Sequence, residues 1–224
     1  MIALRTSFRR LRALGRDKSG AALLEFAFTL PLVLTMGLTG AEITNYIITK
    51  MRISQIALHL ADNAARIGSG SQLQAKTITE ADINDLLTGA QLQSGELDLN
   101  ANGRVIISSL EPTASPNTAG TYKIAWQRCK GAKTTRLSSY GRVGVTSGAN
   151  KGVDMTGMGP SGRQTVAPDN GAAMFVEVYY EYKPLIKTSL SPDSNMTEIA
   201  SMMVRDRRDL TQIYNVENVT RSTC

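Results

Sequence analysis

The sequence contains few of the residues that catalysis and metal binding require. Among its 224 residues there is one histidine, His59, and there are two cysteines, Cys129 and Cys224. These numbers exclude a multi-histidine metal site, a four-cysteine zinc site and a dense network of disulfides. The sequence also shows no nucleophile–base pair and no metal-ligand spacing. We therefore expect a protein that is not an enzyme and that carries no cofactor and no metal.

The chain also has few aromatic residues, and little excess basic charge outside its first 20 residues. Aromatic residues make up 5% of the chain, whereas hydrophobic residues reach 42% and charged residues 20%, as in ordinary folded proteins. The net charge of +6 is concentrated at one end. Residues 1–20 hold six basic side chains and one acidic side chain, and the rest of the chain holds 19 basic and 18 acidic ones. Because the body of the chain lacks an obvious basic patch, we expect no nucleic-acid partner.

One apolar segment, residues 21–48, follows the basic leader. A helix needs about 20 mostly apolar residues to cross a bilayer, so this segment is long enough. The positive-inside rule keeps the N-terminus in the cytoplasm and places residues after about 50 outside. A secretory signal peptide or a plain signal anchor would have a similar charge pattern. Neither explains Glu25, because a carboxylate inside a membrane helix costs up to roughly 2.5–3.5 kcal/mol and therefore indicates a function.

The residues around Glu25 resemble a known processing signal. The run from Lys18 to Phe26 is similar to the cleavage signal of type IV prepilins, in which a membrane peptidase cuts after a glycine. Residues 9–48, including Leu30-Pro31-Leu32 and Gly40-Ala41-Glu42, resemble the N-terminal signature of TadE-like (TadE or TadF) minor pilins. These pseudopilins belong to the tight-adherence (Tad/Flp) type IVb pilus, which serves adhesion, biofilm formation and surface attachment.

The resemblance implies specific roles for three residues. A prepilin peptidase would cleave between Gly20 and Ala21 and so remove residues 1–20 as a cytoplasmic leader. Glu25 would then pair with the free amino terminus of a neighbouring subunit, because opposite charges in a low dielectric offset part of each other's desolvation.

The resemblance also implies partners and a location. The partners are the prepilin peptidase, other pilins and pseudopilins, the inner-membrane assembly platform and the lipid bilayer. The expected location is the bacterial inner membrane, crossed once, with a periplasmic C-terminal domain that could join an extracellular pilus. The alternative is a bitopic membrane-anchored protein whose extracytoplasmic domain binds a ligand and has no assembly role.

Two further residues of the span have expected roles. Pro31 removes one backbone hydrogen bond, so we expect it to kink the transmembrane helix; a tolerated proline without a function is the alternative. Glu42 lies about 25 Å beyond Glu25 along an ideal helix. We expect Glu42 near the outer headgroups, where a charged carboxylate costs little.

The rest of the chain predicts an α+β fold. Apolar residues continue at helical spacing, so we expect one helix over residues 21–67, first a transmembrane anchor and then an amphipathic, pilin-like stalk. Thr79 and Asp82 predict the start of a short helix that Gly89 would end.

Strand signals predict a small antiparallel sheet in the head domain, residues 68–224. One face of this sheet would pack on the helix, and Ile124 and Trp126 would share one face. The expected strands are residues 104–110, 122–129, 173–182 and an edge strand at 199–205.

Residues 131–171 and the two cysteines complete the predicted head. This segment holds nine of the 19 glycines, which is typical of a flexible loop, and we favour a subunit contact there over a ligand site. Cys129 and Cys224 lie on the predicted outer side, where an oxidising periplasm favours a disulfide. Closing a loop of about 95 residues is worth roughly 4–5 kcal/mol in chain-entropy models. Two unpaired thiols are the alternative.

Overall fold

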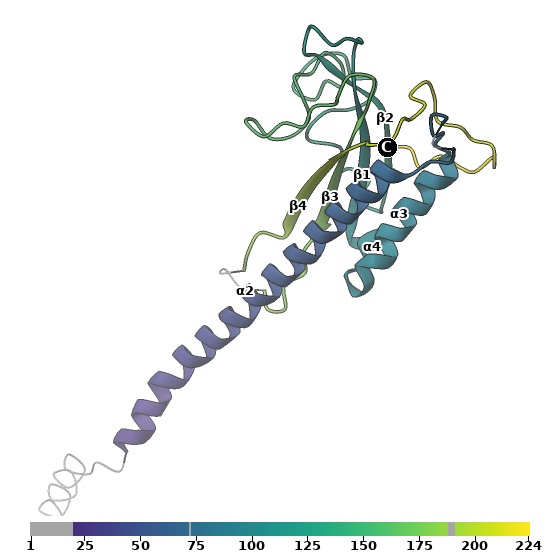
Figure 1. Ribbon diagram of the computed structural model, residues 1–224. Helices are drawn as coiled ribbons and strands as arrows, with labels where there is room; N and C mark the ends of the chain where they lie inside the picture. The colour runs from purple at the N-terminus through teal and green to yellow at the C-terminus, as the bar shows by residue number, and fades with distance from the viewer. Residues whose placement is uncertain (1–19, 72, 188–190) are drawn as a thin grey trace, which may run out of the picture. The chain divides into compact units, whose positions relative to one another are not determined.

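The computed structural model describes residues 20–71, 73–187 and 191–224, so the leader before Gly20 lies outside the described residues. The chain has the α+β fold that the sequence predicts (Figure 1). Its elements are α2 (Ala21–Arg66), α3 (Glu80–Ser94), the 3-10 helix η1 (Gly95–Leu97), α4 (Leu99–Asn102), β1 (Gly103–Pro112), β2 (Tyr122–Lys130), β3 (Ala173–Glu181) and β4 (Asn195–Met203).

The chain divides into two compact units. The anchor unit holds the described residues of Met1–Asn45 and Pro184–Pro192, and the head unit holds those of Tyr46–Lys183 and Asp193–Cys224. Helix α2 contributes to both units and ends one residue before the predicted boundary. By length and composition, α2 is apolar enough to cross a membrane, and none of its most apolar stretch is buried.

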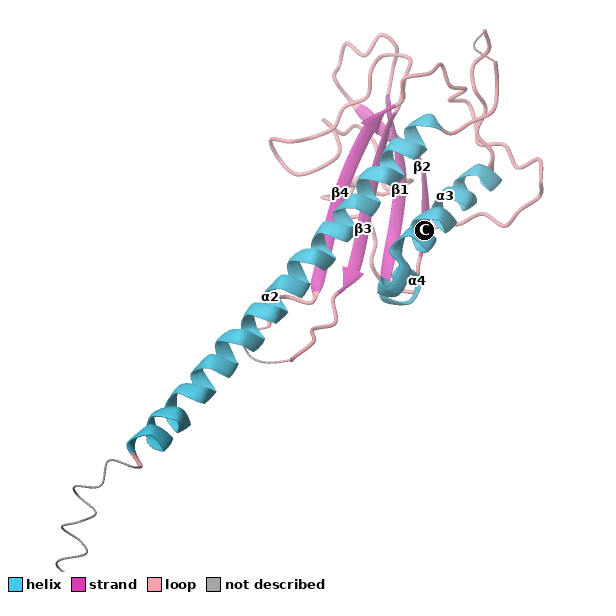
Figure 2. Ribbon diagram, turned by 60° about the horizontal axis from the view of Figure 1, so that its bottom comes forward, coloured by secondary structure: helices cyan, strands magenta, loops and turns pink. Residues whose placement is uncertain are grey.

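The four strands form an antiparallel sheet in the order β2-β1-β3-β4. Within the head unit, the second half of α2 and helix α3 cover one face of this sheet (Figure 2). The apolar side chains at this interface come from α2, α3, β1 and β3 and include Ile53, Leu60, Ile83, Leu87, Ile107, Val176 and Val178. The predicted packing of a sheet face on the helix is therefore confirmed.

The irregular segment 131–171 covers the opposite face of the sheet. Met158 from this segment is fully buried against Leu110 and Phe175, and the ring of Tyr140 meets that of Phe175 edge-on at 5.6 Å between centroids. The sequence predicted a flexible loop here. The segment is irregular but packs on the sheet, and its flexibility and a subunit contact there remain predictions. Both faces of β1 and β3 are buried, and on the far face Leu110 and Phe175 lie beside the polar residues Ser108 and Glu177. Both faces therefore need a cover, and the glycines permit the tight turns of a packed irregular segment.

Two local predictions were wrong for identifiable reasons. Helix α3 begins as predicted with a capping box between Thr79 and Asp82, but it continues through Gly89 to Ser94. A single glycine weakens a helix without ending it. Ile124 faces the 131–171 segment whereas Trp126 packs on the helix side, because a bulge in the β1–β2 pairing inserts one extra residue between them.

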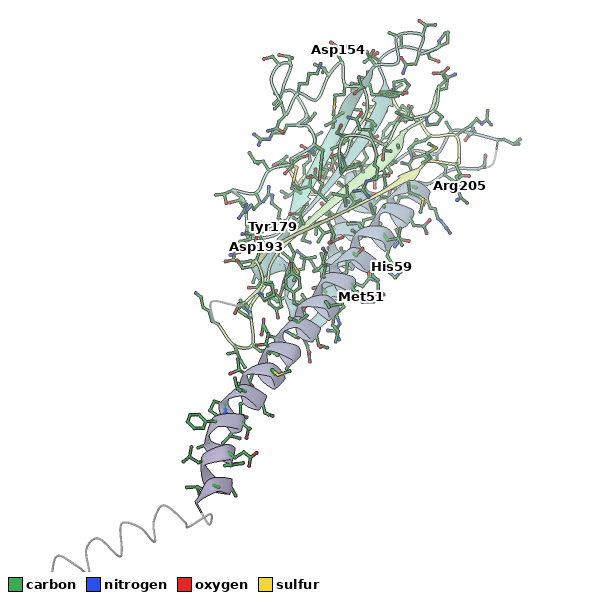
Figure 3. The ribbon with its side chains drawn as sticks, turned by 90° about the vertical axis from the view of Figure 1, so that its left-hand side faces the viewer. Met51, His59, Asp154, Tyr179, Asp193 and Arg205 are labelled. Atoms are coloured by element: carbon green, nitrogen blue, oxygen red, sulfur yellow. A yellow bond between two sulfur atoms is a disulfide. The ribbon has the colours of Figure 1, made fainter. Side chains whose placement is uncertain are left out.

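The predicted strands are confirmed with small shifts at their ends. Strand β4 begins four residues earlier than expected and is the edge strand next to β3. Figure 3 shows it between the labelled residues Asp193 and Arg205, with Met51 and His59 on the side of α2 that faces away from the sheet.

Candidate functional site

The predicted processing site lies at the start of α2. Gly20 and Ala21 are both exposed, and the carbonyl of Gly20 accepts the N–H of Leu24 at 3.1 Å, so Gly20 leads directly into the first helical turn. A Cβ atom built on Gly20 would have no neighbour within 4 Å. The folded chain therefore does not require glycine at this position.

Glu25 lies four residues after Ala21, on the same side of α2. Its side chain is exposed, and among the described residues it has no ion-pair partner. The neighbouring apolar side chains Leu24 and Phe26 are 58% and 60% exposed, so the carboxylate stands in an apolar surface without a protein cover. Its pairing with another subunit remains a prediction.

Pro31 lies inside α2, and the helix continues through it. Proline has no N–H, so the carbonyl four residues earlier lacks its usual helical donor. The hydroxyl of Thr35 donates to the carbonyl of Pro31 at 2.7 Å, which satisfies a polar side chain within the helix. The predicted kink at Pro31 remains a prediction.

Glu42 has partners that the sequence did not predict. It is 5% exposed, and its Oε2 accepts the backbone N–H groups of Leu185 at 2.8 Å and Ile186 at 3.2 Å. Its expected position near the outer headgroups remains a prediction. The partners are 143 and 144 residues away in sequence, so no local pattern could have revealed this contact. Glu42 therefore fastens the 184–187 segment to α2 inside the anchor unit.

The predicted disulfide between Cys129 and Cys224 is confirmed. Their Cα atoms are 4.9 Å apart, and 95 residues separate them in sequence. The N–H of Cys129 also donates to the carbonyl of Ser222 at 2.8 Å. The last residues are thereby held against β2, so the disulfide closes residues 129–224, which include β3 and β4, into one covalent loop.

Buried charges in the head connect its elements, and no sequence pattern predicted them. Glu80, at the start of α3, is 1% exposed and accepts two hydrogen bonds from Arg128 on β2, at 2.9 and 2.5 Å. The Nε of Arg221 lies 3.3 Å from the same carboxylate. This arrangement ties α3, β2 and the C-terminal segment to one another.

Arg208 closes the end of α2. Its Nη2 donates to the carbonyls of Ala64 and Ile67 at 3.0 and 2.9 Å, groups that otherwise lack partners at a helix C-terminus. Burial lowers the pKa of Arg208 to about 10, and the nearby carboxylates of Asp206 and Glu111 act in the opposite direction. Arg208 is therefore a structural cation of the head.

One cleft of the head, of about 560 Å³, is lined by Trp126, Glu111 and basic side chains and contains the ion pair between Glu80 and Arg128. Burial raises the pKa of Glu111 here and that of Glu177 on the far face, where Ser138 donates a hydrogen bond to Glu177. In the described part of the chain, no three histidine, cysteine or acidic residues could hold a metal ion.

The candidate functional site is therefore the exposed first half of α2, with Gly20, Ala21 and Glu25 at its start. The head supplies a disulfide-closed α+β domain that buries the second half of the same helix. The chain matches no family model, no curated protein and no solved structure.

Proposed function

We propose that this protein is a minor pilin or pseudopilin similar to the TadE and TadF proteins of tight-adherence pili. A prepilin peptidase would cleave it after Gly20, and the mature chain would contribute to pilus assembly. The observation that carries the proposal is the exposed Gly20–Ala21 bond at the start of an apolar helix, with Glu25 four residues further on.

The chemistry of this segment supports assembly rather than simple anchoring. Cleavage would leave a positive amino group on Ala21 and a negative charge on Glu25, both at one end of an apolar helix. Each charge is costly in hydrocarbon unless an opposite charge lies beside it. Pairing between neighbouring subunits would remove part of this cost, so the membrane helix would favour an assembled state over an isolated one.

The exposed apolar side chains of α2 support a membrane location. Every residue from Ala21 to Leu38 is exposed, and large apolar side chains such as Phe28 and Met36 are 69% and 76% exposed. Such a surface needs lipid or other helices around it. We place it in the bacterial inner membrane, with the basic leader in the cytoplasm and the head in the periplasm, where the disulfide is stable.

Cleavage is tested by the intact mass and N-terminal sequence of the protein from cells with and without the prepilin peptidase. A chain that begins at Ala21 only when the peptidase is present supports the proposal. Gly20→Arg should leave an uncleaved precursor, and Gly20→Ala is the matched control with a small side chain. Because a Cβ at Gly20 meets nothing, neither variant should disturb the fold. A leader retained in both strains would favour the membrane-anchored binding protein instead.

Assembly is tested separately at Glu25. Glu25→Ala should be cleaved normally but should assemble poorly, as measured by the amount of sheared surface pili. Glu96→Ala is the matched control, because Glu96 is an exposed acidic residue of the head. Normal pilus formation by Glu25→Ala would remove the charge-pairing argument.

A further inference from the structure

We propose that residues 184–187 of the anchor unit dock on the outer surface of a phospholipid bilayer and that Glu42 holds them there. This would be a second membrane contact besides α2. It rests on the proposed insertion of α2 in a membrane.

The length of α2 places Glu42 at the bilayer surface. Residues 21–41 span about 30 Å at 1.5 Å per residue, which is the thickness of the hydrocarbon core. Glu25 is the one charged residue in that stretch, and Glu42 is the next. With Ala21 at one edge of the hydrocarbon, Glu42 reaches the opposite edge.

The contacts of Glu42 bring the 184–187 segment to the same level. Glu42 accepts hydrogen bonds from two successive backbone N–H groups, those of Leu185 and Ile186, and its side chain is 5% exposed. Hydrogen bonds to a charged acceptor are stronger than neutral ones. The segment is therefore held beside α2 at the point where the helix would leave the hydrocarbon.

The exposed side chains of this segment fit a lipid surface. Leu185 is 66% exposed, and Lys187 is exposed as well. The sequence Pro184-Leu185-Ile186-Lys187 contains no acidic residue. An apolar side chain beside a lysine suits the boundary between acyl chains and anionic headgroups.

Depth-dependent fluorescence quenching tests the docking. The full chain, carrying an environment-sensitive fluorophore on Leu185→Cys, is reconstituted in vesicles of phosphatidylcholine and phosphatidylglycerol that contain nitroxide-labelled lipids. The native cysteines form a disulfide, so the introduced cysteine is the one free thiol of the described chain. We expect nitroxides near the headgroups to quench a label at position 185 strongly.

Two further positions make the result interpretable. Leu34→Cys, in the middle of the apolar part of α2, should be quenched by nitroxides deep in the acyl chains. Leu92→Cys, a 78% exposed leucine of α3, is the matched control and should be quenched weakly. A label at Leu34 that escapes quenching would overturn the membrane insertion of α2. Strong quenching at Leu34, with Leu185 no more quenched than Leu92, would overturn the docking alone.

The role of Glu42 is tested in the same vesicles. Glu42→Ala should reduce quenching at position 185 and leave quenching at position 34 unchanged. Glu42→Gln should retain most of it, because its amide oxygen still accepts N–H groups. Unchanged quenching at 185 in Glu42→Ala would show that Glu42 does not hold the segment at the bilayer.

Discussion

Both halves of α2 are rich in apolar side chains, but their surroundings differ. From Ala21 to Leu38 every residue is exposed, whereas in the head unit Ile53, Ala57 and Ala61 of the same helix are completely buried. The difference teaches that hydrophobicity alone does not identify a core helix. The distribution of apolar and polar side chains around the helix axis distinguishes a segment that packs on protein from one suited to lipid.

The buried residues of the head half are spaced three and four apart, and polar residues lie between them. Ile53, Ala57, Leu60 and Ala64 form one face, and exposed residues such as Gln55 separate them along the chain. The small alanines on this face let the helix backbone approach the sheet closely. The anchor half has apolar side chains on all sides, which is the composition expected of a helix in lipid.

The largest effect is expected from placing a charge in each half. Leu60→Asp puts a carboxylate at a position that is 3% exposed, and we expect it to prevent cooperative folding of the head, at a cost of about 4 kcal/mol or more. Leu34→Asp, at a position that is 52% exposed, should leave head stability unchanged and reduce membrane insertion.

Urea unfolding in detergent measures the first effect. The single tryptophan, Trp126, lies in the head and reports on its unfolding alone. Carbonate extraction of membranes measures insertion. Equal effects of the two substitutions on Trp126 unfolding would contradict the separate roles of the two halves.

The next effect concerns the end of the head half of α2. Arg208→Met removes two hydrogen bonds to the carbonyls of Ala64 and Ile67, and we expect a loss of about 2 kcal/mol in the free energy of unfolding. Arg205→Met is the control, because Arg205 is exposed. A loss of similar size in both variants would show that the total charge, and not the helix end, is responsible.

A pH-dependent effect should be confined to the head. Burial raises the pKa of Glu177 above its ordinary value of 4.5, so the folded state holds this proton more tightly than the unfolded state. The contribution of Glu177 to stability therefore falls as the pH rises from 4.5 through the raised pKa. Glu177→Gln removes this loss, so the variant should gain stability relative to the natural chain over that range.

Glu181→Gln should change the stability of the head in the opposite direction. The hydrogen bond and charge of Lys133 lower the pKa of Glu181, so its contribution to stability is present above pH 4.5 and is lost as the pH falls through the lowered pKa. The variant should therefore lose stability relative to the natural chain as the pH rises to 4.5. Urea unfolding measured against pH for both variants checks both directions. If both variants gained stability, or both lost it, the raised pKa of Glu177 and the lowered pKa of Glu181 would not explain the result.

The smallest effect compares two helical glycines. Gly89 in α3 and Gly37 in the anchor half of α2 would each have no atom within 4 Å of an added Cβ. Gly89→Ala should stabilise the head by about 0.5–1 kcal/mol, because alanine has the higher helix propensity. Gly37→Ala should leave the thermal unfolding of the head unchanged. A stabilised head in Gly37→Ala would mean that the anchor half takes part in head folding.

Much of the fold follows from local sequence signals. The apolar run of α2, the capping residues Thr79 and Asp82 and the strand signals predicted the main elements within a few residues, because each signal lies inside the element it predicts. The sequence also paired Cys129 with Cys224, since no other cysteines are present. The candidate site could also be found from the sequence, because Gly20, Ala21 and Glu25 lie within six residues of one another.

The contacts between distant segments were decided only by the tertiary structure. Glu42 binds backbone groups 143 residues away, and Glu80 meets Arg128 across 48 residues. The packing of residues 131–171 on the second face of the sheet likewise depends on strands that lie outside that segment. No local pattern encodes such pairs, because burial and hydrogen bonding select their partners only when the elements come together.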